Sequence, residues 1–110
     1  GYGRLFEHFF IWEVIKRNSY TRKRYKLFYL VTKDGEEVDL IIERNNKSTI
    51  LIEIKSGTDP NISDAKHLLR MQPNFPKSEV WVVSQIEHPR QEKGVRFLKW
   101  ESALAELFDG

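Results

Sequence analysis

With 110 residues, of which 40% are hydrophobic and 13% aromatic, the chain can bury one core but not two, so we expect a single domain over residues 1–110 rather than a disordered segment. The absence of cysteine excludes disulfides and thiolate metal sites such as zinc fingers, and no apolar run reaches the roughly 20 residues that a membrane span needs. The net charge of +2 is too small to indicate nucleic-acid binding by itself, and the composition predicts a soluble, cytoplasmic protein.

The first half of the chain predicts one helix followed by three strands. Residues 4–17 place apolar side chains three and four apart, which predicts a largely buried helix that ends at Asn18. The strands are rich in aromatic and β-branched residues and cover residues 25–32, 37–44 and 48–56. An Asp-Gly turn joins the first two strands and a second tight turn follows Arg44, so both connections are expected to be hairpins.

The second half predicts a helix, two strands and a short closing helix. Asn61 or Ser63 can cap a helix that continues through Met71. Residues 79–84 are typical of an interior strand, which a crossover helix would make parallel to the strand before it. The remaining expectations are a polar, mobile loop over residues 86–94, a strand over 95–100 and a helix over 101–108. The order is α-β-β-β-α-β with an appended strand and helix, which indicates a mixed α/β fold.

Charged residues interrupt two of the apolar strands. Side chains alternate along a strand, so Glu53 and Lys55 share one face, roughly 6.6 Å apart, and can converge on one small ligand. The same alternation puts Asp39 on the face opposite Val38 and Leu40. If the two strands form a hairpin, Asp39 lies across from Glu53, and neighbouring carboxylates repel unless a cation stands between them. Because Mg²⁺ prefers carboxylate and water oxygens, the pair predicts a Mg²⁺ site.

Two of these assignments have alternatives. Glu7 could join the acidic pair from the first helix, since the positions three, four and seven residues later are apolar, or it could be a first-turn acid favoured by the helix dipole. The charges of Glu53 and Lys55 could also belong to an exposed sheet face with cross-strand partners. The aliphatic triplets at residues 40–42 and 50–52 favour strands that are covered on both faces.

Other conspicuous residues carry weaker signals. The stretch from Lys16 to Lys26 contains basic residues and no acid, and it is either a solvated loop after a helix or a contact for phosphate groups. The histidines are too scattered to predict a ligand set and are expected at the surface: His8, His67 and His88. The tryptophans are expected in the core rather than as base-stacking platforms: Trp12, Trp81 and Trp100.

Three short motifs together resemble the PD-(D/E)XK nuclease superfamily, which has the restriction-endonuclease-like fold. They read Gly3-Arg4-Leu5-Phe6-Glu7, Glu37-Val38-Asp39-Leu40 and Ile52-Glu53-Ile54-Lys55-Ser56. More narrowly, the motifs are similar to those of the uncharacterised C-terminal domain of many prokaryotic AAA-type ATPases, and the resemblance covers nearly the whole chain. Val38 stands where the name of the superfamily motif has proline. The chain opens with Gly1 rather than methionine, so we expect it to be the C-terminal part of a longer ATPase.

The resemblance implies a Mg²⁺- or Mn²⁺-dependent domain that hydrolyses phosphodiester bonds in DNA. Asp39 and Glu53 would hold the ion, Glu7 would support the site from the first helix, and Lys55 would orient the attacking water. The residues implied to hold the nucleic-acid backbone are Arg22, Lys23, Arg24, Lys66 and Arg70. The alternative is a catalytically inactive domain on the same scaffold, for nucleic-acid binding or protein docking. A phosphate-binding G-x-x-x-x-G-K-[ST] motif does not occur, so the chain is not expected to hydrolyse ATP itself.

Overall fold

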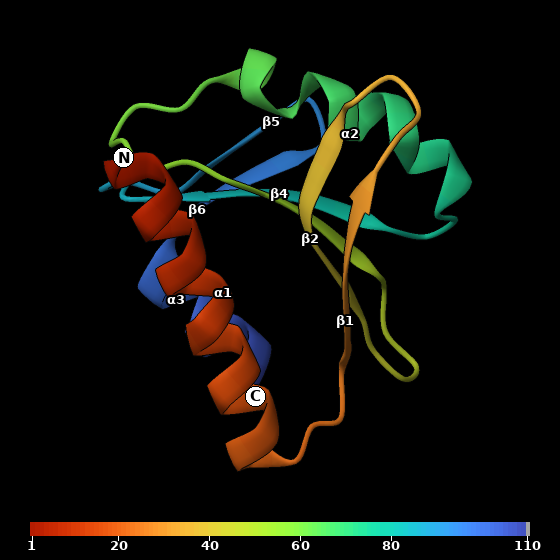
Figure 1. Ribbon diagram of the computed structural model, residues 1–110, viewed down its shortest axis with the longest axis vertical. Coiled ribbons are helices and arrows are strands. Elements are labelled where there is room, and N and C mark those ends of the chain that lie inside the picture. Colours follow the sequence, from red (N-terminus) through yellow and green to blue (C-terminus); the bar gives the residue numbers. More distant parts are fainter. Residues whose placement is uncertain (110) are drawn as a thin grey trace.

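The computed structural model describes residues 1–109 and consists of one mixed sheet with helices on both faces (Figure 1). The strands are β1 (Lys26–Val31), β2 (Glu37–Glu43), β3 (Ile50–Ile54), β4 (Glu79–Ser84), β5 (Arg90–Glu92) and β6 (Val95–Lys99). The helices are α1 (Tyr2–Thr21), α2 (Lys66–Met71) and α3 (Trp100–Phe108), with short 3₁₀ turns η1 (Ile62–Ala65) and η2 (Gln72–Asn74) on either side of α2. Within the described residues, no helix has both the length and the apolar character to cross a membrane.

The sheet has the strand order β1-β2-β3-β4-β6-β5. The pairs β1/β2 and β2/β3 are antiparallel hairpins, and β3 pairs with β4 in parallel. A parallel pair requires a crossover, and the segment containing η1, α2 and η2 supplies it. The predicted mixed α/β class, both hairpins and the parallel crossover are therefore confirmed.

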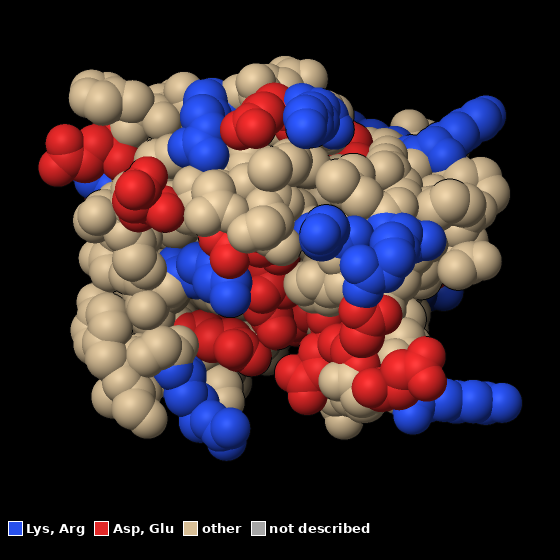
Figure 2. Space-filling view, turned by 90° about the horizontal axis from the view of Figure 1, so that it is seen from above, with Lys and Arg blue, Asp and Glu red and all other residues tan. Residues whose placement is uncertain are grey.

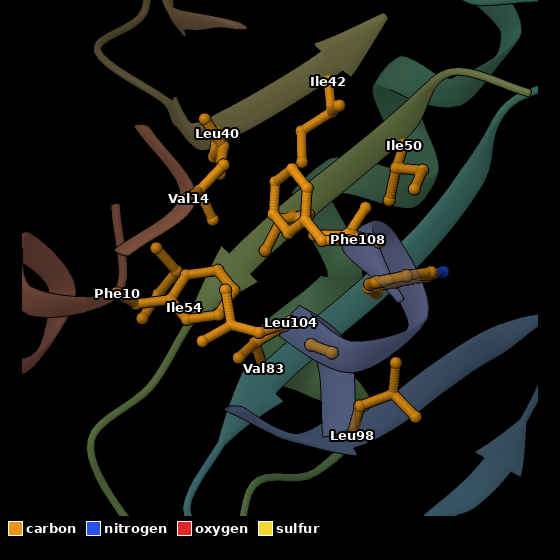
Figure 3. Close-up of a cluster of buried hydrophobic side chains, with 14 of the residues drawn as sticks. Phe10, Val14, Leu40, Ile42, Ile50, Ile54, Val83, Leu98, Leu104 and Phe108 are labelled. Carbon is orange, nitrogen blue, oxygen red and sulfur yellow. The ribbon is translucent and has the colours of Figure 1, made fainter. Parts of the chain in front are cut away.

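Each face of the sheet has its own apolar core. On one face α1 and α3 cover the sheet, and Figure 3 shows Phe10, Val14 and Leu104 pointing toward strand residues such as Ile54. On the other face α2 and η1 cover it, with Leu68 buried among strand side chains. Every residue of β3 is buried because this strand has a helix layer on both sides. A charged side chain on β3 is therefore held in an apolar environment.

Helix α1 is longer than predicted at both ends. It begins at Tyr2 and continues past Asn18 to Thr21, where Arg22 adopts a left-handed conformation. Asn18 does not end the helix, because its side-chain amide donates to the carbonyl of Tyr25 and its side-chain oxygen accepts the N–H of the same residue, both at 2.9 Å. Asn18, where the helix was predicted to end, instead links α1 to the residue before β1 through these two hydrogen bonds.

The prediction that α1 is largely buried is wrong. Its buried residues are Phe6, Phe10 and Val14. A second row of large side chains, which we term the apolar stripe of α1, remains exposed and comprises Tyr2, Leu5, Phe9 and Trp12. Because only one side of a helix can contact the sheet, apolar residues spread around α1 cannot all be covered. Trp12 is 57% exposed and lies outside the core, whereas Trp81 is fully buried as predicted.

Two further expectations need correction. Residues 86–94 are not a loop throughout, because Arg90–Glu92 forms β5 and pairs with β6 across a tight turn at Lys93 and Gly94. Val38 does not share a face with Leu40, since it belongs to the core on the α2 side. The pairing of β1 with β2 shifts register between Phe28 and Leu30, and such a bulge breaks the regular alternation of side chains.

Candidate functional site

The second and third sequence motifs meet where the ladder between β2 and β3 stops. The last paired residues are Leu40 and Ile52, so the next step in this register puts Asp39 opposite Glu53, as predicted. Beyond that point the carboxylate of Asp39, rather than a backbone carbonyl of β2, accepts the N–H of Ile54 at 2.9 Å. Asp39 thus caps the end of the β2/β3 ladder, and this bond fixes the position of its carboxylate.

The first motif approaches the same place from α1. A Cβ atom added to Gly3 would lie 3.7 Å from Ser56 Oγ, so the first turn of α1 runs beside the end of β3. One turn later, Glu7 lines a cavity of about 900 Å³ between α1 and the β1/β2 hairpin. Asp39 lines this cavity as well, together with Arg4 and with apolar residues of α1 and β1. Glu7 and Asp39 therefore face the same open space.

A second cavity, of about 480 Å³, lies on the α2 side of the sheet. Asp39 borders this cavity too, and Glu53 lines it with Lys66, His67 and Arg70 of α2. Seen from the end of the molecule where α1 begins, acidic side chains gather in a hollow with lysine and arginine side chains around it (Figure 2). Asp39 lines both cavities and therefore lies between Glu7 of α1 and Glu53 of β3.

The side chain of Glu53 is 11% exposed and has cationic neighbours on two sides. Its Oε1 atom lies 3.2 Å from Nε2 of His67, and its Oε2 atom lies 3.6 Å from Nζ of Lys55. Nζ of Lys55 is also 3.8 Å from Oδ1 of Asp64. Because Lys55 is 44% exposed, its ammonium group can contact a bound substrate while it stays near Glu53.

Burial raises the pKa of all three acids, and neighbouring carboxylates add to each shift. Burial, followed by the charge of Asp39, raises the pKa of Glu53 from 4.5 to about 8, although Lys55 opposes the shift. The pKa of Asp39 is raised chiefly by burial, against the lowering effect of the Ile54 N–H. Burial and then the charge of Asp39 raise the pKa of Glu7. Negative charge is therefore unfavourable here without an added cation.

The donor set fits a hard divalent cation. Within residues 1–109, no three carboxylate or imidazole groups already surround one point as ligands. Mg²⁺ needs fewer protein ligands than that, because it keeps several waters and is commonly held by one or two carboxylates. Asp39 and Glu53 can supply these oxygens, and a cation beside them would offset the burial of their charges and the repulsion of Glu53 by Asp39.

The predicted phosphate contacts fall into two groups. Lys66 and Arg70 line the same cavity as Glu53, and Arg70 forms an ion pair with Glu36. The other group follows α1 directly and comprises Arg22, Lys23 and Arg24. At 1.5 Å per helical residue, Arg22 lies roughly 22 Å along the axis from Glu7, at the far end of α1 (Figure 1). Only Lys66 and Arg70 are placed beside the acids.

Two residues of the site were missed by sequence reasoning. His67 is not a surface histidine, since its side chain is 21% exposed and contacts Glu53. The signal was available, because Ser63, Lys66, His67 and Arg70 recur at helical spacing and all line the cavity near Glu53. Arg4 had no such signal, because its position in the cavity depends on where α1 crosses the sheet.

Comparisons with known proteins give one family match. A family model described as a domain of unknown function (DUF4143) matches residues 2–102. No curated protein and no solved structure matches the chain significantly. The matched segment contains Glu7, Asp39, Glu53 and Lys55, so the whole acidic site lies inside the family domain.

Proposed function

The chain belongs to the DUF4143 family, and from this starting point we propose that it is a Mg²⁺- or Mn²⁺-dependent nuclease domain with the restriction-endonuclease-like fold that hydrolyses DNA. The observation that carries the proposal is the position of the half-buried Asp39 opposite the buried Glu53: both carboxyl groups have raised pKa values, and the amine of Lys55 lies next to Glu53. Acids whose pKa values are raised by burial in a cavity are characteristic of functional sites, because taking a carboxylate out of water costs free energy.

The three motif residues beside the ion site would have different tasks. Asp39 and Glu53 would hold the ion, and the Ile54 N–H would keep Asp39 in place. Glu7 would add negative charge from α1 in the cavity that it shares with Asp39. When bound, the ion would lower the pKa of coordinated water and neutralise charge on the phosphate oxygens.

Lys55 would assist the chemical step directly. Hydrolysis forms a P–O bond to water and breaks the P–O bond to a sugar oxygen, which takes up a proton. The Lys55 ammonium, held between Glu53 and Asp64, can orient the attacking water and offset the negative charge that grows on phosphorus-bound oxygens. Such stabilisation is strongest where water is excluded, and the nearby carboxylate of Glu53 is buried.

The activity is tested by measuring cleavage of plasmid and branched DNA by the intact protein with Mg²⁺ or Mn²⁺ and with EDTA. The proposal predicts nicking with either ion and none with EDTA. Absence of nicking on every substrate with saturating metal would contradict it. We further propose that the domain acts while joined to an AAA-type ATPase module, and the same assay on the longer protein would show whether ATP changes the rate.

Lys66 and Arg70 are expected to hold the DNA backbone. Replacing both by alanine should weaken DNA binding at all sequences and reduce the slope of log affinity against log salt by about 2, because each lost phosphate contact removes about one released counterion. Fluorescence anisotropy with labelled DNA in Ca²⁺ measures both quantities. Lys47→Ala, in the exposed β2/β3 turn, is the control and should change neither. An unchanged slope in the double variant would exclude this surface.

The alternative function, a catalytically inactive docking domain, is favoured by one observation. The apolar stripe of α1 leaves large side chains exposed, with Leu5 at 68%, and Phe9 packs edge-on against Trp100 with ring centroids 5.1 Å apart. Exposed patches of this kind are characteristic of protein interfaces. A docking domain would bind its partner through this stripe and would show no metal-dependent nicking, so the cleavage assay separates the two functions.

A further inference from the structure

The side chain of His67 brings a ring nitrogen into contact with the acidic site. Nε2 of His67 lies 3.2 Å from Oε1 of Glu53, and both side chains line the cavity that Asp39 borders. Glu53 comes from β3 and His67 from α2, so two rigid elements fix the contact. The packing of Leu68, the next residue in α2, against the sheet core holds the helix in this position.

The distance between the two atoms suits two ligands of one metal ion. In an octahedral site with metal–ligand bonds near 2.1 Å, neighbouring donor atoms lie about 3.0 Å apart. The Nε2 to Oε1 distance of 3.2 Å is close to this value. Asp39, the third donor group, lines the same cavity as His67 and Glu53. In the described part of the chain, residues 1–109, the three groups do not already surround one point, so they would have to close around the ion when it binds.

We propose that His67 is a ligand of the divalent ion, with Glu53 and Asp39, and that this nitrogen makes the site prefer Mn²⁺ and similar transition metals to Mg²⁺. The inference rests on the proposed function and specifies its metal. Imidazole binds transition metals well and Mg²⁺ poorly, whereas a set made only of carboxylates and water suits Mg²⁺. His67 thus distinguishes this site from one built on the acids alone.

A simple ion pair between His67 and Glu53 is the competing explanation. The charged groups that line the cavity with His67 are Glu36, Glu37 and Asp39 from the β1/β2 hairpin, Glu53 of β3, and Lys66 and Arg70 of α2. An ion pair would leave the metal preference unaffected by His67, since the imidazole would then only balance Glu53. The two explanations therefore differ in which metals the protein binds.

The experiment measures metal binding by the intact protein, without reference to cleavage. Calorimetry with Mn²⁺ and with Mg²⁺ is applied to the wild type, to His67→Gln and to the exposed control His88→Gln. The wild type and the control should bind Mn²⁺ at least about tenfold more tightly than Mg²⁺, and His67→Gln should lose about tenfold in Mn²⁺ affinity but less than about threefold in Mg²⁺ affinity. Pulsed electron paramagnetic resonance of bound Mn²⁺ should show coupling to a nitrogen nucleus in the wild type.

The outcomes distinguish this inference from the proposed function. Two results together would overturn the role of His67 and leave the nuclease proposal standing. The first is that bound Mn²⁺ shows no nitrogen coupling in the wild type. The second is that His67→Gln loses affinity equally for Mn²⁺ and Mg²⁺, or for neither. Nitrogen coupling that disappears in His88→Gln but persists in His67→Gln would also overturn it. If neither ion binds the wild type, both proposals fail. The resonance measurement on the wild type needs no variant, so misfolding of a substituted protein cannot obscure the result.

Discussion

Replacing Asp39 by asparagine is expected to slow metal-dependent DNA cleavage by a factor on the order of 10³, because removing one of two charged ligands would take away about 4 kcal/mol of transition-state stabilisation. Asparagine is preferable to alanine at this position. Its side-chain oxygen can still accept the Ile54 N–H, which would otherwise be left unpaired at a cost of about 1–3 kcal/mol. The measurement is the initial rate of plasmid nicking at saturating Mg²⁺ or Mn²⁺.

The matched control for this variant is Asp109→Asn. Asp109 follows α3, is exposed and is outside both cavities, so its neutralisation should leave the nicking rate unchanged. Circular dichroism and thermal unfolding of both variants show whether the fold is kept. Wild-type cleavage by a folded Asp39→Asn protein would remove this carboxylate from the mechanism.

Replacing Glu53 by glutamine is expected to stabilise the metal-free protein at high pH. The pKa of Glu53 is about 8 in the folded protein against 4.5 when unperturbed, so between these values the folded state keeps a proton that the unfolded state has lost. The stabilising contribution of protonated Glu53 to the free energy of unfolding is therefore fully present below pH 4.5 and is lost as the pH rises through 8. Glutamine has no proton to lose, and the gain at pH 9 should be on the order of 2–4 kcal/mol.

Urea unfolding at pH 5 and pH 9 in EDTA measures this difference. The two proteins should have nearly equal unfolding free energies at pH 5, and Glu53→Gln should be more stable at pH 9. Glu43→Gln, at an exposed position on β2, is the matched control and should follow the wild type at both values. A Glu53→Gln protein that is no more stable than the wild type at pH 9 would mean that Glu53 ionises without difficulty in the fold.

The part of the site that lies on the paired strands could be predicted from the sequence. Alternation along β3 puts Glu53 beside Lys55, and the tight turn between β2 and β3 sets the register that faces Asp39 with Glu53. Both are local consequences of chain geometry. The parallel pairing of β3 with β4 was also predictable, because the crossover segment is long enough to return the chain in the same direction.

Features that depend on tertiary placement could not be predicted in this way. The bulge that moves Val38 to the α2 side depends on pairing with β1, and it has no sequence signal in β2 itself. Strand β5 is short and polar, and its turn uses Lys93, a non-glycine residue at a φ of 50°, instead of the usual Asn or Asp. The exposure of Trp12 follows from the direction in which α1 crosses the sheet.

The account rests on the claim that Asp39 and Glu53 hold one divalent ion between β2 and β3. Anomalous diffraction from crystals of the intact protein soaked in Mn²⁺ tests this most directly. We predict a peak within about 2.3 Å of a carboxylate oxygen of each residue, in the cavity near His67. A peak at other residues only, or none at saturating Mn²⁺ with both carboxylates pointing into solvent, would contradict the claim.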